Sequence, residues 1–493
     1  MNTNLSERLN RLSPSATLAM SQRSSELKAE GVDVINMSVG EPDFNTPDHI
    51  KAAAIKAVED NYSRYSPVPG YPELKKAIVN KLKNENGLDY APSQILCSNG
   101  AKQSVCNTIM AIVSAGDEVI IPTPYWVSYP QMVLLAEGTP VYVEATIEQD
   151  FKITPEQLEA AITPKTKALI LCSPSNPTGS VYSKEELEAL KNVLLRHEDV
   201  IVIADEIYEH INYVGQHASM AQFPDIKDRV VIINGVSKAY AMTGWRIGFI
   251  AAPEWIVKGC NKLQGQYTSG PCSVSQKAAE VAFAGDQQCV EDMRKAFERR
   301  KDLIVKLAKE IPGLEVNEPQ GAFYLFPKCS SFFGKSHGER VINNSTDLAM
   351  YLLEEGHVAT VGGDAFAYSK SLNTVTIGSK VKSLAQGVFY SSPVKDAYVF
   401  AATPPSVSAY LFSSNPVIHV YASSLAAYKA SDWAQYGTLV GDLDNYTSIE
   451  QTIEDAESNE ADAPVYDLMG RRVTQMKAGN IYIRGGKKFI AKP

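Results

Sequence analysis

The chain has 493 residues, 44% of them apolar, and a formal net charge of −9 at neutral pH. This length suffices for two or more domains with buried cores, and the mild acidity argues against nucleic acid as the main partner. No run of about twenty apolar residues occurs, so we expect no membrane span. The N-terminus lacks the apolar core of a signal peptide, and seven scattered cysteines show no metal-ligand spacing. We therefore expect a cytoplasmic protein with reduced thiols and no metal centre.

Helical and strand-like segments alternate over the first three quarters of the chain. Pro47 opens an amphipathic run that reaches about Asp60, and Thr154 and Ser183 each begin a capping-box pattern. Four short runs between the helices are apolar apart from Glu118 at the start of the first, as strands covered on both faces are. These runs are residues 118–121, 168–171, 200–203 and 230–233. The alternation predicts an α/β fold with a mostly parallel sheet, whose ligands bind at the carboxyl ends of the strands.

Lys238 lies in a small-residue turn after the last of these runs, and Arg246 follows eight positions later. A turn lysine near fixed donors suits an amine that forms an imine with an aldehyde cofactor, and a guanidinium can fork onto a phosphate. Gly100 and Ala101 join a strand to a helix, where backbone N–H groups can approach a phosphate. Taken alone, Lys238 has a plainer reading, because most lysines in such turns are solvated surface groups.

Two further candidates follow strand-like runs. Trp126 lies between prolines, and its indole can stack on a pyridine ring, although an ordinary core role is the alternative. Asp205 ends an apolar run, where a carboxylate can keep a pyridinium nitrogen protonated and so make the ring an electron sink. A single aspartate at a strand end is more often a helix cap. The functional interpretation therefore depends on the several motifs occurring together and in order.

The segment from Val231 to Gly248 resembles the lysine signature of class I pyridoxal-phosphate aminotransferases. The chain is similar to the bacterial aspartate aminotransferase branch of that family, with matching motifs in order from about residue 5 to Phe366. The resemblance implies a fold-type I transferase with a large domain that binds pyridoxal 5′-phosphate and a small α/β domain. It also implies a homodimer that moves an amino group between an amino acid, with aspartate or glutamate favoured, and a 2-oxo acid.

The resemblance assigns a role to each candidate residue. Lys238 would hold the cofactor and then carry a proton, and Asp205 would bond the ring nitrogen. The other cofactor ligands that it implies are Gly100, Ala101 and Arg246 at the phosphate, Trp126 on the ring, Asn176 and Tyr208 at the ring oxygen, Ser237 beside the lysine, and Tyr65 at the phosphate of the neighbouring subunit. The substrate ligands that it implies are Gly40, Lys102 at the distal carboxylate, Trp126, Asn176 and Phe323. Without the resemblance, Gly40 reads as a turn, Tyr65 as a packing residue and Lys102 as a surface lysine.

The resemblance stops at Phe366. The family continues with a short strand whose arginine binds the substrate α-carboxylate, but this chain has no arginine between Phe366 and Arg471. Residues 365–377 instead resemble one turn of the leucine-rich repeats of Bacteroides-type surface proteins, and residues 417–429 resemble the end of such an array. One repeat cannot bury its face alone, so we expect this tail to fold poorly unless it docks on the enzyme.

These matches predict the domain borders. The expected order is an N-terminal arm with part of the small domain (1–40), the large cofactor-binding domain (41–285), a partial small domain (286–366), a leucine-rich-repeat-like remnant (367–440), an acidic linker (441–462) and a short β-rich module (463–493). The junction at residues 364–366 fits both families, which favours a fusion at short shared sequence, either genomic or made during assembly of the sequence data. We expect an impaired aminotransferase, with a catalytically crippled cofactor-binding protein or a surface protein defined by its tail as the alternatives.

Overall fold

The computed structural model describes residues 6–12, 16–338, 340–366, 374–377, 381–384, 394–407, 411–412, 415–443, 481–484 and 487–490. The chain forms two compact units, one over Met1–Tyr368 and the other over Ser369–Pro493. The segment 367–373, the acidic linker beyond residue 443 and most of the expected C-terminal module lie outside the described residues. Among the helices that are described, none is long and apolar enough to cross a membrane.

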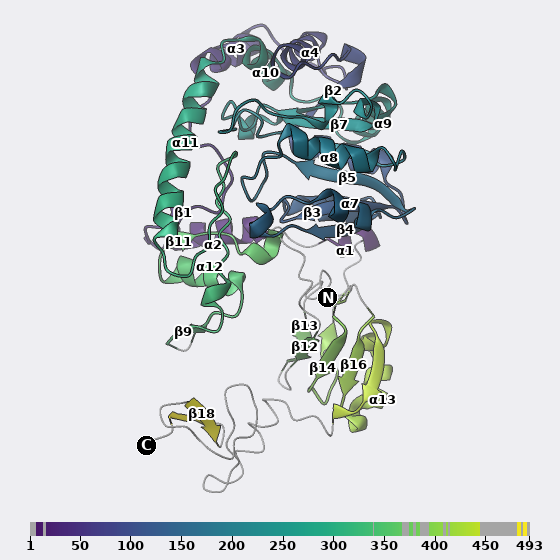
Figure 1. The fold of residues 1–493 in the computed structure, drawn as a ribbon, viewed down its shortest axis with the longest axis vertical. Helices are drawn as coiled ribbons and strands as arrows, with labels where there is room; N and C mark the ends of the chain where they lie inside the picture. Colours follow the sequence, from purple (N-terminus) through teal and green to yellow (C-terminus); the bar gives the residue numbers. More distant parts are fainter. Residues whose placement is uncertain are drawn as a thin grey trace. The chain divides into compact units, whose positions relative to one another are not determined.

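A seven-stranded sheet forms the centre of the first unit (Figure 1). Its order is β2-β8-β7-β6-β5-β3-β4, and all neighbouring strands are parallel except at β8, which is antiparallel to β2 and β7. The strands are Ile95–Asn99 (β2), Glu118–Thr123 (β3), Thr139–Glu144 (β4), Thr166–Cys172 (β5), Ile201–Asp205 (β6), Val230–Gly235 (β7) and Ile247–Ala251 (β8). The four apolar runs are β3, β5, β6 and β7, so the predicted mostly parallel α/β sheet is confirmed.

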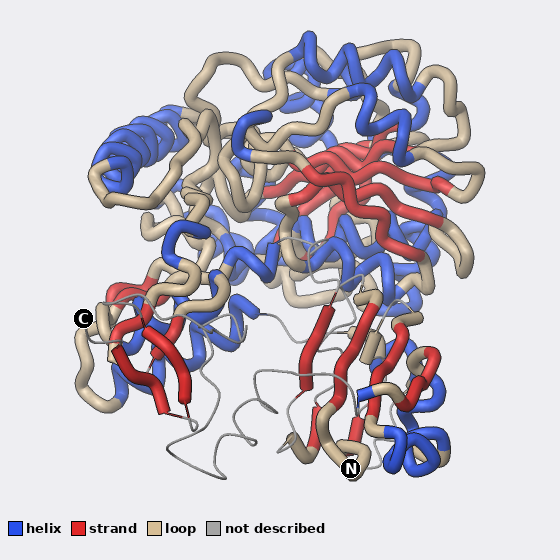
Figure 2. Tube along the Cα trace, turned by 60° about the horizontal axis from the view of Figure 1, so that its bottom comes forward, coloured by secondary structure: helices blue, strands red, loops and turns tan. Residues whose placement is uncertain are grey.

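Helices cover both faces of this sheet (Figure 2). Successive strand residues point to opposite faces, so Leu169 and Val202 belong to one core while Ile170 and Ile203 belong to the other. Helices α3, α4, α8 and α10 pack on the first face, and α5, α6 and α9 pack on the second. The helices of this unit are Glu7–Asn10 (α1), Ala16–Ala29 (α2), Asp48–Glu59 (α3), Pro72–Asn86 (α4), Ala101–Ile112 (α5), Ser128–Leu135 (α6), Pro155–Ala161 (α7), Lys184–Leu194 (α8), Glu254–Tyr267 (α9), Ser273–Ala284 (α10), Gln288–Lys309 (α11) and Ser345–Glu354 (α12).

Local sequence explains where several helices begin. The hydroxyls of Thr154 and Ser183 accept hydrogen bonds from the backbone N–H groups of Gln157 and Glu186, which confirms both predicted capping boxes. Pro47 precedes α3, as the amphipathic pattern predicted. These helix starts follow strands or loops at the sheet and fix the points where the chain reverses direction.

A second, smaller core joins the two ends of the first unit. Strand β1 (Ile35–Asn36) pairs in parallel with β11 (Val358–Ala359), and Val34 and Leu353 belong to one buried cluster with their neighbours. The 22-residue helix α11 runs along one side of the unit between the region of α10 and that of α12 (Figure 1). A short antiparallel pair lies near α12, formed by β9 (Ser336–His337) and β10 (Arg340–Val341). Segments far apart in sequence therefore build this core together.

Residues 320–326 form no ladder with another strand. Gly321 makes a single isolated bridge with Asn212. The next residue, Ala322, has φ +56°, a left-handed conformation that bends the chain out of the extended form. This bend directs Phe323 and Tyr324 toward the strand ends of the large sheet, where they belong to one cluster with Tyr208.

Four parallel strands form the main sheet of the second unit. They are β12 (Thr374–Ile377), β14 (Asp396–Val399), β16 (Val417–Val420) and β17 (Thr438–Gly441), paired in that order. Thr374 pairs with Asp396, Asp396 with Val417 and Val417 with Thr438, so paired residues lie 22, 21 and 21 positions apart. The sequence predicted one such turn, and the described residues hold four strands at this spacing, the last of which crosses the expected border at residue 440.

The second unit has a buried core of its own. Ala397 and Ile418 point into it from the strands, and Trp433 is fully buried and donates its indole N–H to the carbonyl of Pro405 at 2.9 Å. The remaining elements of this unit are Ser383–Leu384 (β13), Ser406–Val407 (β15), Leu425–Lys429 (α13), Ile481–Arg484 (β18) and Lys487–Ile490 (β19). Several strands share this core, which a single isolated turn could not provide.

Candidate active site

The Lys238 amine lies just beyond the carboxyl end of β7. Its Nζ donates to the backbone oxygen of Gly40 at 2.6 Å and lies 5.7 and 5.8 Å from the ring centres of Tyr208 and Phe323. Burial lowers the pKa of this ammonium to about 8, although the carboxylate of Glu41 raises it. An amine with such a pKa has a substantial neutral fraction near pH 8, and the neutral form is the nucleophile. One reactive amine is thus surrounded by Gly40, Glu41, Tyr208 and Phe323.

Asp205 is the last residue of β6, and its side chain is buried. The hydroxyl of Tyr129 donates to its Oδ2 at 2.6 Å, and the backbone N–H of Ile207 donates to its Oδ1 at 3.3 Å. Burial raises the pKa of this carboxyl group to about 6, against the lowering effect of those two hydrogen bonds. An adjacent cation would lower the pKa again, so the site favours a positively charged partner for Asp205. Tyr129 was missed from the sequence, although it follows Trp126 by about one helical turn.

Asn176 and Tyr208 meet at a second tyrosine that the sequence did not single out. The Asn176 amide donates to the hydroxyl of Tyr324 at 3.3 Å, and the hydroxyl of Tyr208 lies 2.5 Å from the same oxygen. The ring of Phe323 stacks on Phe297 with centres 5.1 Å apart. The sequence singled out Phe323 in this segment, whereas its neighbour Tyr324 makes the polar contacts.

Glycines leave room for an anion cradle at the start of α5. Gly100 precedes this 12-residue helix with φ +80°, and a Cβ there would collide with the Arg246 guanidinium. A Cβ on Gly248 would collide with the backbone N–H of Ala101. Arg246 is exposed and donates to the carbonyl of Thr243 at 2.8 Å. An arginine beside the N-terminus of a helix attracts a phosphate through charge and backbone N–H groups, so these residues fit a phosphorylated ligand.

Lys102 and Trp126 lie together beside the same helix start. The Nζ atom of Lys102 is 5.2 Å from the centre of the Trp126 ring, and Tyr129 meets that ring edge-on at 5.3 Å. Burial and the nearby Arg246 guanidinium lower the pKa of Lys102. Ser237 is buried directly before Lys238. The arrangement places an indole face and a second cation within the region that the sequence predicted for the cofactor ring and the substrate.

Tyr65 is not part of this group in the single chain. Its side chain is 97% exposed, which separates it from the buried residues around Lys238. The expectation that it acts at the site of a neighbouring subunit stays a prediction.

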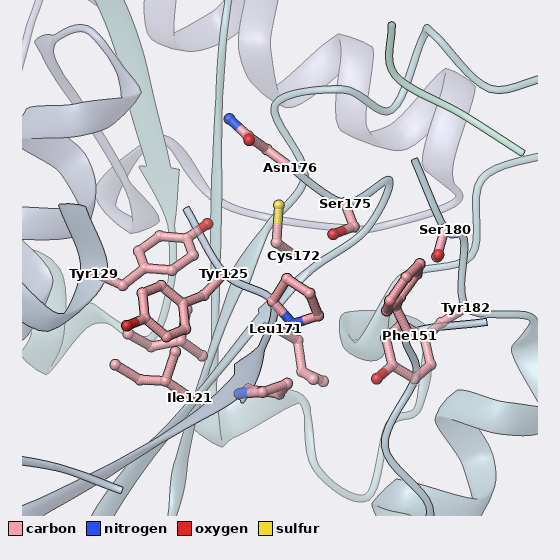
Figure 3. Close-up of a pocket in the computed structure, with 13 residues that line it drawn as sticks. Ile121, Tyr125, Tyr129, Phe151, Leu171, Cys172, Ser175, Asn176, Ser180 and Tyr182 are labelled. Carbon is pink, nitrogen blue, oxygen red and sulfur yellow. The ribbon is translucent and has the colours of Figure 1, made fainter. Parts of the chain in front are cut away.

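A small pocket lies next to the Asn176 loop (Figure 3). Tyr129 and Asn176 border it, whereas Lys238 does not, so it adjoins the site and is not its centre. Its lining residues are Ile121, Pro122, Pro124, Tyr125, Tyr129, Phe151, Ile170, Leu171, Cys172, Ser175, Asn176, Ser180 and Tyr182.

Comparison with known proteins decides the family. Residues 32–383 match the model of the class I and II aminotransferases. The chain belongs to this family. Its members depend on pyridoxal phosphate and act on amino acids and 2-oxo acids. The predicted aminotransferase activity is therefore confirmed at the level of the family.

Similar proteins carry related names. The chain is 50% identical to a probable aspartate/prephenate aminotransferase of Rickettsia bellii, over 73% of this chain and 92% of the relative. It is 49% identical to a bifunctional aspartate aminotransferase and glutamate/aspartate-prephenate aminotransferase of Petunia hybrida, over 75% of this chain and 80% of the relative. The solved aspartate aminotransferase of Rhizobium meliloti superposes with a TM-score of 0.72 at 44% identity, over 75% of this chain and 93% of that one. The predicted fold-type I architecture of this aminotransferase is confirmed.

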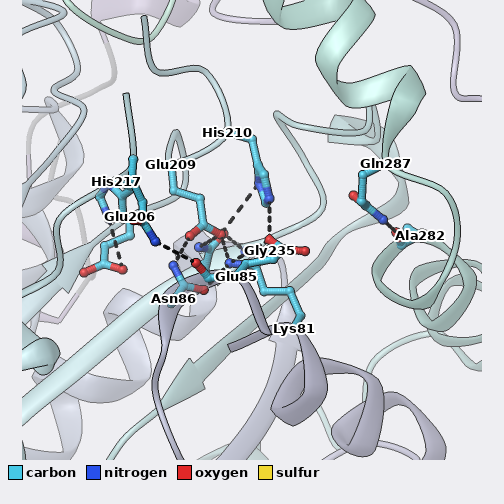
Figure 4. Close-up of polar contacts among 12 residues, drawn as sticks. Lys81, Glu85, Asn86, Glu206, Glu209, His210, His217, Gly235, Ala282 and Gln287 are labelled. Carbon is cyan, nitrogen blue, oxygen red and sulfur yellow. Dashed lines mark hydrogen bonds and ion pairs between the residues drawn. The ribbon is translucent and has the colours of Figure 1, made fainter. Parts of the chain in front are cut away.

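A buried polar network supports the segments that carry the site (Figure 4). The Lys81 ammonium of α4 is fully buried and pairs with the buried carboxylate of Glu209, to which the amides of Asn86 and Asn234 also donate at 2.8 Å each. Burial opposes ionisation of Glu209, but the charges of Lys81, His210 and His217 outweigh it and hold the pKa of Glu209 below its usual range. Glu209 directly follows Tyr208, and Asn234 precedes Lys238 by four residues. The network therefore joins both site segments to α4.

Metal-ligating side chains also meet in this network. Ligand atoms of Glu206, Glu209 and His217 lie within 4.8 Å of one another. The Lys81 ammonium already bonds Glu209, and His217 Nε2 lies 3.3 Å from the Glu206 carboxylate. We therefore assign this cluster a structural role in the aminotransferase, with the ammonium in place of a metal cation.

Lys81→Met should lower the free energy of unfolding of the first unit by roughly 3–5 kcal/mol, because Glu209 would lose its buried cationic partner. Lys83→Met is the matched control, since Lys83 lies on the same helix and pairs with Asp89 at side-chain exposures of 66% and 82%. The control should cost less than about 1 kcal/mol. Urea denaturation of both variants would measure the difference, and equal losses would contradict the importance of the buried pair.

Proposed function

We propose that this aminotransferase binds pyridoxal 5′-phosphate through Lys238 and moves amino groups between an amino acid and a 2-oxo acid. The observation that carries the proposal is the meeting of a buried lysine of low pKa with a buried strand-end aspartate and a glycine-lined anion cradle. The bound cofactor would supply an electron sink for the charge that develops at the substrate Cα. The names of the similar proteins support the same chemistry.

Each residue then has a distinct task. The Lys238 amine would hold the cofactor through its aldehyde and would carry a proton at the substrate Cα. Asp205 keeps the ring nitrogen protonated, since its buried carboxylate favours a cationic partner. The other proposed cofactor ligands are Gly100, Ala101 and Arg246 at the phosphate, Trp126 on the ring face, Asn176 and Tyr208 at the ring oxygen, and Ser237 beside the lysine.

For the substrate we propose an acidic amino acid, aspartate or glutamate. Lys102 supports this choice, because its ammonium lies over the Trp126 ring and can meet a distal carboxylate. Gly40 and Asn176 would serve the α-carboxylate through a backbone N–H and an amide, and Phe323 would line the apolar side. The Rickettsia bellii and Petunia hybrida proteins are named for aspartate and prephenate, which agrees with carboxylate-rich substrates.

The proposal for Lys238 predicts how cofactor uptake depends on pH. Since burial lowers the pKa of Lys238 to about 8, its nucleophilic neutral form increases as pH rises through 8. The rate at which cofactor-free protein takes up pyridoxal 5′-phosphate should therefore rise through that pH and level off above it. Stopped-flow absorbance near 420–430 nm would follow the reaction. Lys238→Ala should abolish the band that borohydride removes, and a band that persists in this variant would refute the assignment.

We further propose that the enzyme is a homodimer in which Tyr65 binds the phosphate of the neighbouring site. Its 97% exposure in one chain supports this role, because the hydroxyl is free to reach a partner. Tyr65→Phe should weaken cofactor binding by roughly 1–2 kcal/mol, the value of a hydrogen bond to a charged group. Equilibrium titration and light scattering would measure affinity and mass. A monomer that binds the cofactor with unchanged affinity would contradict both parts of the proposal.

Amino transfer should be slow in this chain, because the expected α-carboxylate arginine is absent between Phe366 and Arg471. Loss of a buried charged partner costs on the order of 3–5 kcal/mol, or roughly two to four decades in rate. Lys370 is a nearby cation in sequence but lies outside the described residues, and a lysine lacks the fork of a guanidinium. Steady-state kinetics with aspartate and 2-oxoglutarate would test this. A turnover number near about 10 s⁻¹ would show that another group replaces the arginine.

For the second unit we propose a leucine-rich-repeat-like fold joined to the enzyme at residues 364–366. Its parallel strands recur every 21–22 residues along the chain, within the roughly 20–29 residues typical of such repeats. Long-read sequencing of the source DNA across codons 355–380 would test the fusion, and a continuous native gene through this junction would rule out a join made during assembly of the sequence data. We also place the enzyme in the cytoplasm, which agrees with seven free cysteines.

A further inference from the structure

One hydroxyl group lies where three segments of the proposed site meet. The Oη atom of Tyr324 is 2.5 Å from that of Tyr208 and accepts a hydrogen bond from the Asn176 amide at 3.3 Å. A Cβ on Gly40 would lie 2.5 Å from the same oxygen, so the Gly40 loop approaches it without a side chain between them. The carbonyl of Gly40 in turn accepts from Lys238. Tyr324 therefore contacts the Asn176 loop, the turn that carries Tyr208 and the Gly40 loop.

The position of Tyr324 is tightly determined. Its ring meets Tyr208 edge-on with centres 5.6 Å apart, and it packs against Phe323 with centres 4.9 Å apart. Ala322, two positions before Tyr324, donates its N–H to the Ile211 carbonyl at 2.7 Å and accepts from the Tyr213 hydroxyl. Both backbone polar groups of Ala322 thus form hydrogen bonds with residues that closely follow Tyr208 in the chain.

The hydrogen-bond pattern leaves one good acceptor for the hydroxyl proton of Tyr324. Each phenol has a single O–H donor. Because the Tyr324 oxygen already accepts from Asn176, its own proton can go to the oxygen of Tyr208. Tyr208 then keeps its proton for an outside acceptor, and a phenol that accepts a hydrogen bond becomes a stronger donor. Asn176 likewise keeps its second amide N–H.

We infer that Tyr324 is a positioning residue that strengthens the hydrogen bond from Tyr208 to the cofactor ring oxygen and aligns Asn176 with it. The inference rests on the proposed function, in which Tyr208 and Asn176 bind that oxygen. A stronger bond would favour negative charge on the ring oxygen. An oxygen stabilised in this way attracts the proton on the nitrogen that links Lys238 to the cofactor less strongly. The pKa of that nitrogen would therefore be lower.

The test is a pH titration of the absorbance of the cofactor bound to Lys238. Tyr324→Phe should raise the apparent pKa by roughly 0.2–0.6 pH units, the effect of losing about 10–30% of a hydrogen bond to a charged group. Tyr208→Phe should raise it further. In the Tyr208→Phe background, adding Tyr324→Phe should change the pKa less than it does alone, because the bond through which it acts is gone.

Tyr213→Phe is the matched control. It removes a hydroxyl that supports the same bent segment through Ala322 but touches neither Tyr208 nor Asn176 in any contact described. The control should leave the pKa unchanged. An equal rise in Tyr213→Phe, or no rise in Tyr324→Phe with a normal absorbance band, would overturn the inference alone. A wild-type protein without a band that depends on Lys238 would overturn the proposed function, and the inference with it.

Discussion

The ion pair between Lys81 and Glu209 is the interaction on which the site segments depend. Both side chains are withdrawn from water, and two amides complete the coordination of the carboxylate. Such a pair is costly to break because either charge left alone stays in a medium of low polarity. Its value to the enzyme is geometric: it joins helix α4, the end of β7 and the turn after β6, so Asp205, Tyr208 and Lys238 keep their mutual positions.

Burial acts on Lys238 and Asp205 in a coordinated way. Desolvation disfavours charge on both, so it makes the amine more nucleophilic and the carboxyl group more receptive to a cation. The exposed Arg246 lies outside this buried region, beside the start of α5, where an anion would meet both a guanidinium and backbone N–H groups. The site thus separates a dry region for chemistry from an open region for anchoring.

The sequence predicted the sheet and singled out Asp205 and Lys238 because both leave local signals. Apolar runs mark β3, β5, β6 and β7, and Asp205 and Lys238 follow two of them. Tyr129, Tyr324 and Lys81 left no such signal, since they contact partners 76, 116 and 128 positions away. Such contacts arise only when the chain has folded. In the second unit the sequence likewise indicated only one repeat-like turn. The spacing of 21–22 residues between its strands is revealed by their pairing and not by their residue pattern.

The low pKa of Lys238 also bears on the folded enzyme before it meets its cofactor. A lysine in water has a pKa near 10.4 and is almost wholly protonated at neutral pH, whereas burial lowers the pKa of Lys238 to about 8. A larger fraction of its amine is therefore neutral at neutral pH, so an aldehyde that reaches the site would meet a nucleophile that is already deprotonated. The anion cradle at the start of α5 would then select a phosphorylated aldehyde over others that reach the same amine.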